Sequence, residues 1–183
     1  MSDALWILTG APGTGKTAVL DELRADLRCV DEPGRRVLAH QRATAGIGTP
    51  AQDASRFVDL LLELAIADYE TAARQAGPTL FDRGIPDCIA YAVHLGVDPG
   101  PSVTASDRHR YHDEVLVLEP WEHIYTRDDE RTMSFDQTVA FHDALTAAYD
   151  RAGYTLIPVP QGTVQPRVAF VRHHIGTRSG PST

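Results

Sequence analysis

The sequence predicts an α/β fold in which a parallel sheet carries helices on both faces. Short apolar runs alternate along the chain with longer segments whose apolar residues recur every three or four positions, which is helical spacing. The short runs are mostly apolar throughout, and this is typical of strands that are covered on both faces. A glycine-rich turn joins the first apolar run to the first helical segment.

The first elements follow directly from these patterns. A strand is expected at residues 5–8, before Gly10, and a helix at 16–27, where apolar residues lie three or four positions apart. A short second strand is expected at 28–30. Residues 44–50 hold two glycines and a proline, so this segment is expected to be a mobile loop.

Three residues mark the boundaries of later elements. Pro86 can begin a helix because its missing N–H group is not needed in a first turn. Ser134 can cap the helix that follows it, and Gly153 can end that helix. The remaining helices and strands are expected at about 51–77, 79–81, 86–95, 115–118, 135–152, 155–157 and 164–173.

The size and charge of the chain indicate one acidic domain. The sequence has 183 residues, of which 43% are hydrophobic, and this suits a single globular core. We assign residues 1–177 to that domain and 178–183, rich in Gly, Pro and Ser, to a disordered tail. The formal net charge of −8 argues against nucleic acid as a partner, because a phosphate backbone needs a basic face.

The chain is expected to act in the cytoplasm and away from membranes. No run is long and apolar enough to span a bilayer, and the first residues lack the features of a signal peptide. Cys29 and Cys88 are far apart and form no paired motif, which indicates a reducing compartment. The sequence leaves the oligomeric state open.

Residues 10–17 read Gly-Ala-Pro-Gly-Thr-Gly-Lys-Thr, and this pattern predicts a phosphate-binding loop. Glycines let the backbone turn tightly, and the exposed N–H groups then surround phosphate oxygens at the start of a helix. Lys16 is expected to reach the β and γ phosphates, and the Thr17 hydroxyl to bind Mg²⁺. We expect ATP or GTP to be held by Gly10, Ala11, Pro12, Gly13, Thr14, Gly15, Lys16, Thr17 and Ala18.

Asp82 is the second expected ligand of Mg²⁺. It follows the apolar run 79–81, and a carboxylate at the end of a buried strand beside the loop strand binds this ion directly or through water. The alternative is a capping or turn aspartate. His109 and His112 have a spacing that suits a metal, but no further ligand cluster lies nearby and no zinc site is expected.

Acidic and basic residues follow the second and third strands, at the edge of the sheet where ligands bind. Residues 31–35 read Asp-Glu-Pro-Gly-Arg, and a carboxylate there can take a hydroxyl proton during phosphoryl transfer. Glu32 is the first candidate for this base and Asp31 the second. Arg83 follows Asp82 and is expected to hold the transferring phosphoryl group or a polar substrate.

Four further charged residues are candidates for substrate or nucleotide contacts. Arg35 can anchor a substrate or pair with an acidic neighbour. Asp87 is a candidate substrate contact, although the helix dipole alone favours a carboxylate in a first turn. Arg127 and Arg131 lie four residues apart, hence on one face of a helix, and are expected to close over the triphosphate as a lid. The alternative is a solvated helix with paired charges.

The chain resembles the short P-loop ATPases of the "AAA domain" group, which also contains ribosylnicotinamide kinase domains. More distantly it is similar to deoxynucleoside and nucleotide kinases. The resemblance covers residues 5–175. The matching segments are 10–17, Asp-Glu-Pro-Gly-Arg at 31–35, Phe-Asp-Arg-Gly-Ile-Pro-Asp at 81–87, Leu-Glu-Pro-Trp-Glu at 118–122, the charged segment 127–131, and Pro-Val-Pro at 158–160 with Val164 and Arg167.

The resemblance implies a kinase-like P-loop fold, rather than a hexameric motor. This fold is a three-layer α/β/α sandwich with a five-stranded parallel sheet and a small lid. The base, the acidic–arginine pair and the lid arginines of the distant kinases correspond to Glu32, to Asp82 with Arg83, and to Arg127 with Arg131. The loop from Pro160 to Thr163 is implied to touch the base of the nucleotide.

The sequence therefore predicts two alternative functions. The first is a small-molecule kinase that transfers the γ-phosphate of ATP to a hydroxyl of a metabolite or natural product. The second is a nucleotide-dependent switch that regulates a protein partner. The carboxylates and arginines after the strands favour the kinase. Its acceptor is expected between the 31–50 segment, the long helix that begins near residue 51 and the helix that begins at Pro86.

Overall fold

The sheet is parallel, as the sequence predicts. The computed structural model describes residues 4–124 and 133–178. Within these residues five strands form one sheet in the order β2-β3-β1-β4-β5, and each neighbouring pair is parallel. The strands are β1 (Leu5–Gly10), β2 (Arg28–Val30), β3 (Thr79–Asp82), β4 (Glu114–Leu118) and β5 (Thr155–Pro158). Because β1 is central, the loop that follows it lies at the middle of the sheet edge.

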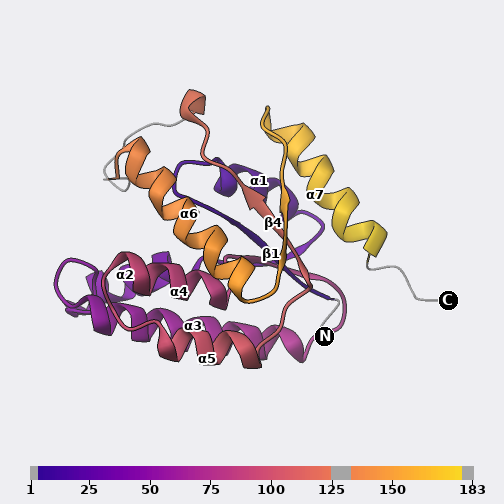
Figure 1. The fold of residues 1–183 in the computed structure, drawn as a ribbon. Coiled ribbons are helices and arrows are strands. Elements are labelled where there is room, and N and C mark those ends of the chain that lie inside the picture. The colour runs from indigo at the N-terminus through magenta and orange to yellow at the C-terminus, as the bar shows by residue number, and fades with distance from the viewer. Residues whose placement is uncertain (1–3, 125–132, 179–183) are drawn as a thin grey trace.

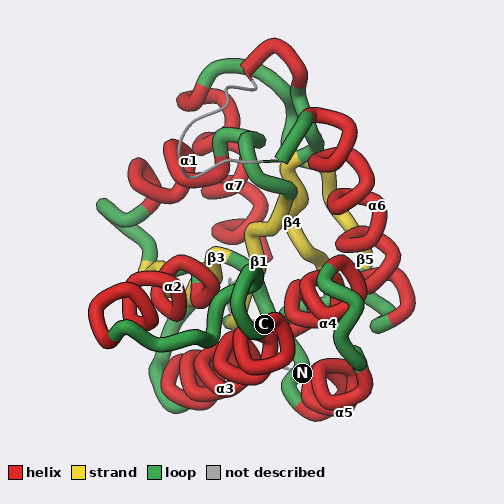
Figure 2. The backbone as a smooth tube through the Cα atoms, turned by 90° about the vertical axis from the view of Figure 1, so that its left-hand side faces the viewer, coloured by secondary structure: helices red, strands yellow, loops and turns green. Residues whose placement is uncertain are grey.

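Helices cover both faces of this sheet (Figure 1). On one face α1 (Lys16–Leu23) and α7 (Val164–Arg178) pack side by side. The other group consists of α2 (Pro33–Thr44), α3 (Ala54–Ala73), α4 (Ile85–His94), α5 (Gly100–Arg108) and α6 (Phe135–Arg151). Figure 2 shows the two groups on opposite sides of the strands. A short 3₁₀ helix, Glu122–Ile124, follows β4. The predicted three-layer α/β/α sandwich is confirmed.

Alternate side chains of β1 belong to two different cores. Trp6 and Leu8 are fully buried in the core that α1 and α7 share, together with Leu20. Leu5 and Ile7 are buried in the core on the side of α3, α4 and α6. Successive side chains of a strand point to opposite faces. A strand that is covered on both faces is therefore apolar at every position, which is the pattern that predicted it.

Several helices differ from the sequence prediction. α1 ends at Leu23 rather than at residue 27, and residues 24–27 form a turn that leads into β2. α2 is not among the expected helices. It begins at Pro33, whose ring suits a first turn. α5 was not predicted because Gly100 and the proline after it are signals of a loop.

The cap of α6 is confirmed. The Gln137 N–H donates to Ser134 Oγ (3.2 Å), and the Ser134 N–H donates to Gln137 Oε1 (2.7 Å). This reciprocal pair satisfies two N–H groups that have no partner within the helix. Pro86 lies in the first turn of α4, also as predicted.

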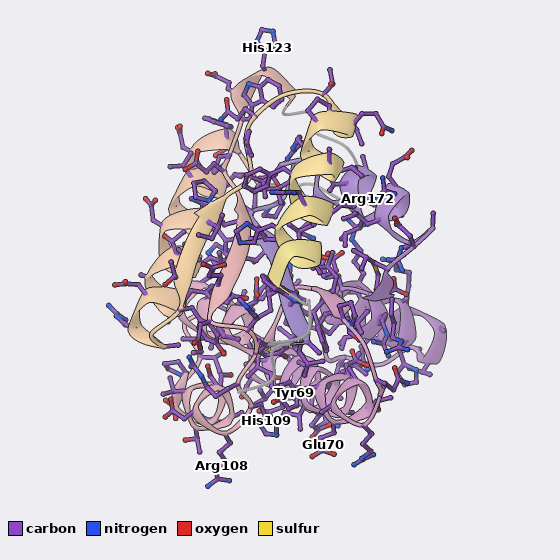
Figure 3. The ribbon with its side chains drawn as sticks, turned by 90° about the vertical axis from the view of Figure 1, so that its right-hand side faces the viewer. Tyr69, Glu70, Arg108, His109, His123 and Arg172 are labelled. Carbon is purple, nitrogen blue, oxygen red and sulfur yellow. The ribbon has the colours of Figure 1, made fainter. Side chains whose placement is uncertain are left out.

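The last helix is longer than predicted. α7 extends to Arg178, and the rest of the predicted tail, 179–183, lies outside the described residues. Arg172 lies on the side of α7 that faces α1 (Figure 3), with its Nε 2.9 Å from the Asp26 carboxylate. This ion pair joins α7 to the end of α1. In the described part of the chain, no helix has both the length and the apolar character needed to cross a bilayer.

Candidate active site

The loop between β1 and α1 needs glycine at two positions for visible reasons. Gly10 has a φ of 149°, and a Cβ atom there would come within 2.5 Å of the Leu118 carbonyl oxygen on β4. Gly15 has a φ of 78°, a left-handed conformation directly before α1. Other residues adopt these conformations only with strain. The loop pattern therefore has a structural cause.

A cavity of about 780 Å³ lies beside this loop. The loop and the start of α1 form one wall. Side chains from α2 and α3, together with residues that follow β2 and β3, form the rest. The lining residues are Ala11, Pro12, Gly13, Thr14, Gly15, Lys16, Thr17, Ala18, Asp21, Glu32, Gly34, Arg35, Leu38, Ala39, Arg42, Phe57 and Arg83. The structure thus brings the predicted loop residues 11–18 together with Glu32, Arg35 and Arg83, whereas Gly10 and Asp82 are not lining residues.

Lys16 and Asp82 form a buried ion pair. The Lys16 Nζ also lies 3.9 Å from Glu32 Oε2. Burial raises the pKa of Asp82, although the Lys16 ammonium opposes the rise. A buried carboxylate of this kind gains from a second cation nearby. The role of Asp82 as a ligand of Mg²⁺ stays a prediction.

Three side chains donate hydrogen bonds to the Glu32 carboxylate. Its Oε1 accepts hydrogen bonds from Arg83 Nε (2.9 Å) and the Tyr91 hydroxyl (3.4 Å), and its Oε2 accepts one from Arg35 Nε (3.1 Å). Burial alone would raise the pKa of Glu32, but the charges of Arg83, Lys16 and Arg35 together lower it to about 2. Glu32 is therefore an ionised carboxylate near neutral pH.

Arg83 is a buried cation held between two carboxylates. Its Nε donates to Glu32, and its Nη1 donates to Asp87 Oδ1 (3.0 Å). Burial alone would lower the pKa of the guanidinium, but Tyr91, Glu32 and Asp87 hold it well above the ordinary value. Its backbone is left-handed, with a φ of 73°. A non-glycine residue in this conformation costs about 1 kcal/mol or more, and such strain is typical of functional sites.

Two predicted site residues, the second candidate base Asp31 and the candidate substrate contact Asp87, lie elsewhere. Asp31 is exposed and pairs with Arg24, and it is not a lining residue of the cavity. Asp87 is buried behind Arg83 and is not a lining residue either. The charge of Asp87 reaches the cavity only through the Arg83 guanidinium. The structure therefore shows no direct contact of Asp87 with the cavity.

The nucleotide end of the site includes a link that the sequence did not predict. The Nη2 of Arg167, on α7, donates to the Thr14 carbonyl oxygen in the loop (2.7 Å). Arg35 approaches the same loop, with its Nη2 3.5 Å from Thr17 Oγ1. Pro160 and Thr163 are not lining residues of the cavity, so their contact with a nucleotide base stays a prediction. The lid candidates Arg127 and Arg131 lie outside the described residues.

Other site residues were also missed. Tyr91 contacts Glu32, and Thr9 and Tyr149 contact Asp87. The available signal for Tyr91 was its position four residues after Asp87, on the same face of α4. Tyr149 lies on α6, and nothing in its sequence context separates it from a core residue.

The His109 side chain packs against an aromatic ring near the end of α5. The His109 ring meets the Tyr69 ring edge to face, with centroids 5.0 Å apart, where the ends of α3 and α5 come together (Figure 3). In the part of the chain that the structure describes, no three His, Cys, Asp or Glu side chains are grouped to hold a metal ion. A magnesium site shared with phosphates needs only one or two protein ligands.

Solved structures resemble this fold at low sequence identity. A NadR protein in complex with NAD and AMP-PNP matches with a TM-score of 0.68 and 15% identity, over 94% of this chain and 50% of that chain. Thymidylate kinase from Ehrlichia chaffeensis matches with a TM-score of 0.59 and 16% identity, over 94% and 98%. Shikimate kinase from Acinetobacter baumannii, in complex with shikimate, matches with a TM-score of 0.57 and 14% identity, over 95% and 93%.

The chain spans about half the length of the NadR protein that it matches. No curated protein matches the chain by sequence. A family model described as "AAA domain" matches residues 5–167, which include β1, the loop and the charged residues after β2 and β3. The chain therefore belongs to this AAA domain family, and its fold is that of the P-loop kinases.

Proposed function

We propose that the protein is a small-molecule kinase that transfers the γ-phosphate of ATP to a hydroxyl group. One observation carries the proposal: Lys16, Glu32 and Arg83 line the same cavity as the phosphate loop. Phosphoryl transfer needs these three things, a cradle for the phosphates, cations beside the transferring group and an acceptor for the hydroxyl proton.

The loop side would bind the nucleotide. Main-chain N–H groups of residues 13–17 would surround the phosphate oxygens, with the start of α1 behind them. The phosphates would compete with Asp82 for the Lys16 ammonium, which its flexible stem allows. Thr17 and Asp82 would hold Mg²⁺, which neutralises phosphate charge when bound.

The other side would perform the transfer. The acceptor oxygen attacks the γ-phosphorus, the bond from that phosphorus to the bridging oxygen breaks, and ADP leaves with the electron pair. The proton of the hydroxyl passes to the Glu32 carboxylate. Because the transition state is loose, the proton leaves late, and a carboxylate of low pKa suffices to orient the hydroxyl. Lys16 and Arg83 stabilise the charge on the transferring oxygens.

The acceptor would lie between α2 and α3. This part of the cavity is lined by Leu38 and Ala39, by Arg42, which has no ion pair among the described residues, and by the buried ring of Phe57. A second cavity of about 410 Å³ shares Leu38 and Arg42 with the first. The acceptor would therefore be a metabolite with an apolar portion, and the second cavity would leave room for a substituent beyond that portion.

A screen tests the proposal. The protein is incubated with ATP labelled in the γ-phosphate and a panel of hydroxylated metabolites, and labelled products are separated. We expect wild type to phosphorylate at least one acceptor. Glu32→Gln should keep its affinity for MgATP within about threefold, while transfer falls by about a hundredfold, the size of a lost general base.

Asp31→Asn is the matched control, because this carboxylate neighbours Glu32 in sequence but faces Arg24 outside the cavity. Its transfer rate should stay near that of wild type. Normal transfer by Glu32→Gln would remove that residue as the base. ATP hydrolysis that no acceptor in the panel alters would favour the alternative function, a nucleotide-dependent switch.

A further inference from the structure

We infer that Asp87 and Tyr149 are positioning residues that fix the Arg83 guanidinium for phosphoryl transfer. The inference rests on the proposed function and adds two residues to it. Neither residue lines the cavity, so neither is a catalytic residue. They act through Arg83, which does line the cavity.

The Asp87 carboxylate accepts hydrogen bonds from four donors. Its Oδ1 accepts from Thr9 Oγ1 (2.7 Å) and from Arg83 Nη1 (3.0 Å). Its Oδ2 accepts from the Gly84 N–H (2.9 Å) and from the Tyr149 hydroxyl. The residue is 1% exposed. A carboxylate with this many donors has no position left for a ligand, and its orientation is fixed by its surroundings.

The four donors come from three parts of the fold. Thr9 lies on β1 directly before the phosphate loop, and Arg83 and Gly84 follow β3. Tyr149 lies on α6, 62 residues from Asp87, and is fully buried. The carboxylate thus ties the guanidinium to the same strand that carries the loop. A shift of Arg83 relative to the phosphates would break at least one of these bonds.

The strain at Arg83 explains why its side chain needs such support. Its left-handed backbone, with a φ of 73°, is anchored by a hydrogen bond from its N–H to the Leu8 carbonyl oxygen (3.1 Å). Strained conformations persist where the surroundings over-determine them. Glu32 holds Nε and Asp87 holds Nη1, so two of the five N–H donors fix the plane of the guanidinium. The other donors remain for phosphoryl oxygens.

The Tyr149 hydroxyl makes it possible to distinguish a positioning role of Asp87 from ordinary helix capping. The bond from the Gly84 N–H to Asp87 caps α4, and a capping role alone would explain that contact. The Tyr149 hydroxyl takes no part in the cap. It holds Oδ2 and so leaves Oδ1 turned toward Arg83 and Thr9. Removing this hydroxyl should loosen the carboxylate while the cap and the aromatic ring remain.

The test compares Tyr149→Phe with Tyr154→Phe. Tyr154 is a neighbouring tyrosine, with its ring centroid 5.7 Å from that of Tyr149, and its hydroxyl accepts from the Tyr111 N–H (3.3 Å), away from Arg83. Both changes remove one buried hydroxyl from the same core. Three quantities are measured for each variant: the affinity for Mg-AMP-PNP, the kcat and KM for ATP turnover with water or an identified acceptor, and the midpoint of thermal unfolding.

For Tyr149→Phe we expect kcat to fall about tenfold, the effect of one lost hydrogen bond to a charged group, while KM and nucleotide affinity change less than about twofold. Asp87→Asn should give a larger fall of kcat in the same direction. Tyr154→Phe should lower the unfolding midpoint by about as much as Tyr149→Phe does, but it should leave kcat near that of wild type.

The outcomes are distinguishable. Wild-type kcat in Tyr149→Phe, or an equal loss of kcat in Tyr154→Phe, would overturn the positioning role and leave the proposed kinase intact. Wild-type protein that binds Mg-AMP-PNP but releases γ-phosphate to neither water nor any acceptor would overturn the proposed function, and the positioning role with it.

Discussion

The two halves of the cavity are built in different ways. The phosphate half is one continuous segment, residues 10–17, whose binding groups are main-chain N–H groups and one ammonium. The acceptor half is assembled from side chains that lie far apart in sequence, such as Glu32, Phe57 and Arg83. A defect in the first half should abolish nucleotide binding. A defect in the second half should spare binding and slow the transfer.

The largest expected effect is on the phosphate half. Lys16→Ala should weaken the binding of MgATP by about a hundredfold or more, because a charge-assisted contact to phosphate in a buried site is lost. Isothermal titration calorimetry measures this change. Lys16 is the only lysine in the sequence, so an amine-reactive ester labels one internal residue, and MgATP should slow that labelling. Undiminished binding by Lys16→Ala would contradict the division between the halves.

Arg83→Gly tests the acceptor half. Glycine adopts a φ of 73° without strain, so the variant removes the cation without opposing the backbone. We expect MgATP affinity to change less than about threefold and transfer to fall about a hundredfold. Free guanidinium at millimolar concentration should restore part of the rate, because Glu32 and Asp87 remain to hold it. Steady-state kinetics with and without guanidinium measures this recovery. A loss of nucleotide binding in Arg83→Gly would argue against the division of the cavity into two halves.

A smaller effect is expected from the glycine at the end of β1. Gly10→Ala places a Cβ atom 2.5 Å from a carbonyl oxygen, whereas Gly162, which also has a φ of 149°, has no atom within 4 Å of such a Cβ. Gly162→Ala is therefore a control for backbone strain alone. We expect Gly10→Ala to cost about 2 kcal/mol more in the free energy of unfolding. Equal values by urea denaturation would mean that the loop moves away from β4 at little cost.

The smallest effect concerns acid. The pKa of Glu32 is lowered to about 2 in the folded protein, so its ion pairs stabilise the fold above the unfolded pKa of about 4.5 and lose this effect as the pH falls toward 2. The difference in unfolding free energy between wild type and Glu32→Gln should therefore shrink by about 1 to 2 kcal/mol between pH 5 and pH 3. A difference that stays constant over this range would show that the neighbouring cations do not lower the pKa of Glu32 in the folded protein.

Most of the fold could be predicted because its signals are local. The strands were found from short apolar runs, and the cap of α6 from Ser134, whose hydroxyl oxygen accepts the Gln137 N–H in the structure. α5 was missed because Gly100 and the proline after it are local signals of a loop, and its packing against α4 overrode them. Asp31 and Glu32 are neighbours in sequence, yet one faces Arg24 and the other Arg83. No local pattern separates two adjacent carboxylates.

The sequence by itself determined the phosphate loop and the positions of the strands, since the binding groups of the loop and the apolar pattern of each strand lie within one short segment of the chain. Only the tertiary structure decided which charges share the cavity. Arg83 acquires its partners Glu32 and Asp87, and Asp87 acquires Tyr149, when β2, β3, α4 and α6 are packed together. Electrostatic and hydrogen-bond energies depend on separation in space and on exclusion of water, and the packed core sets both.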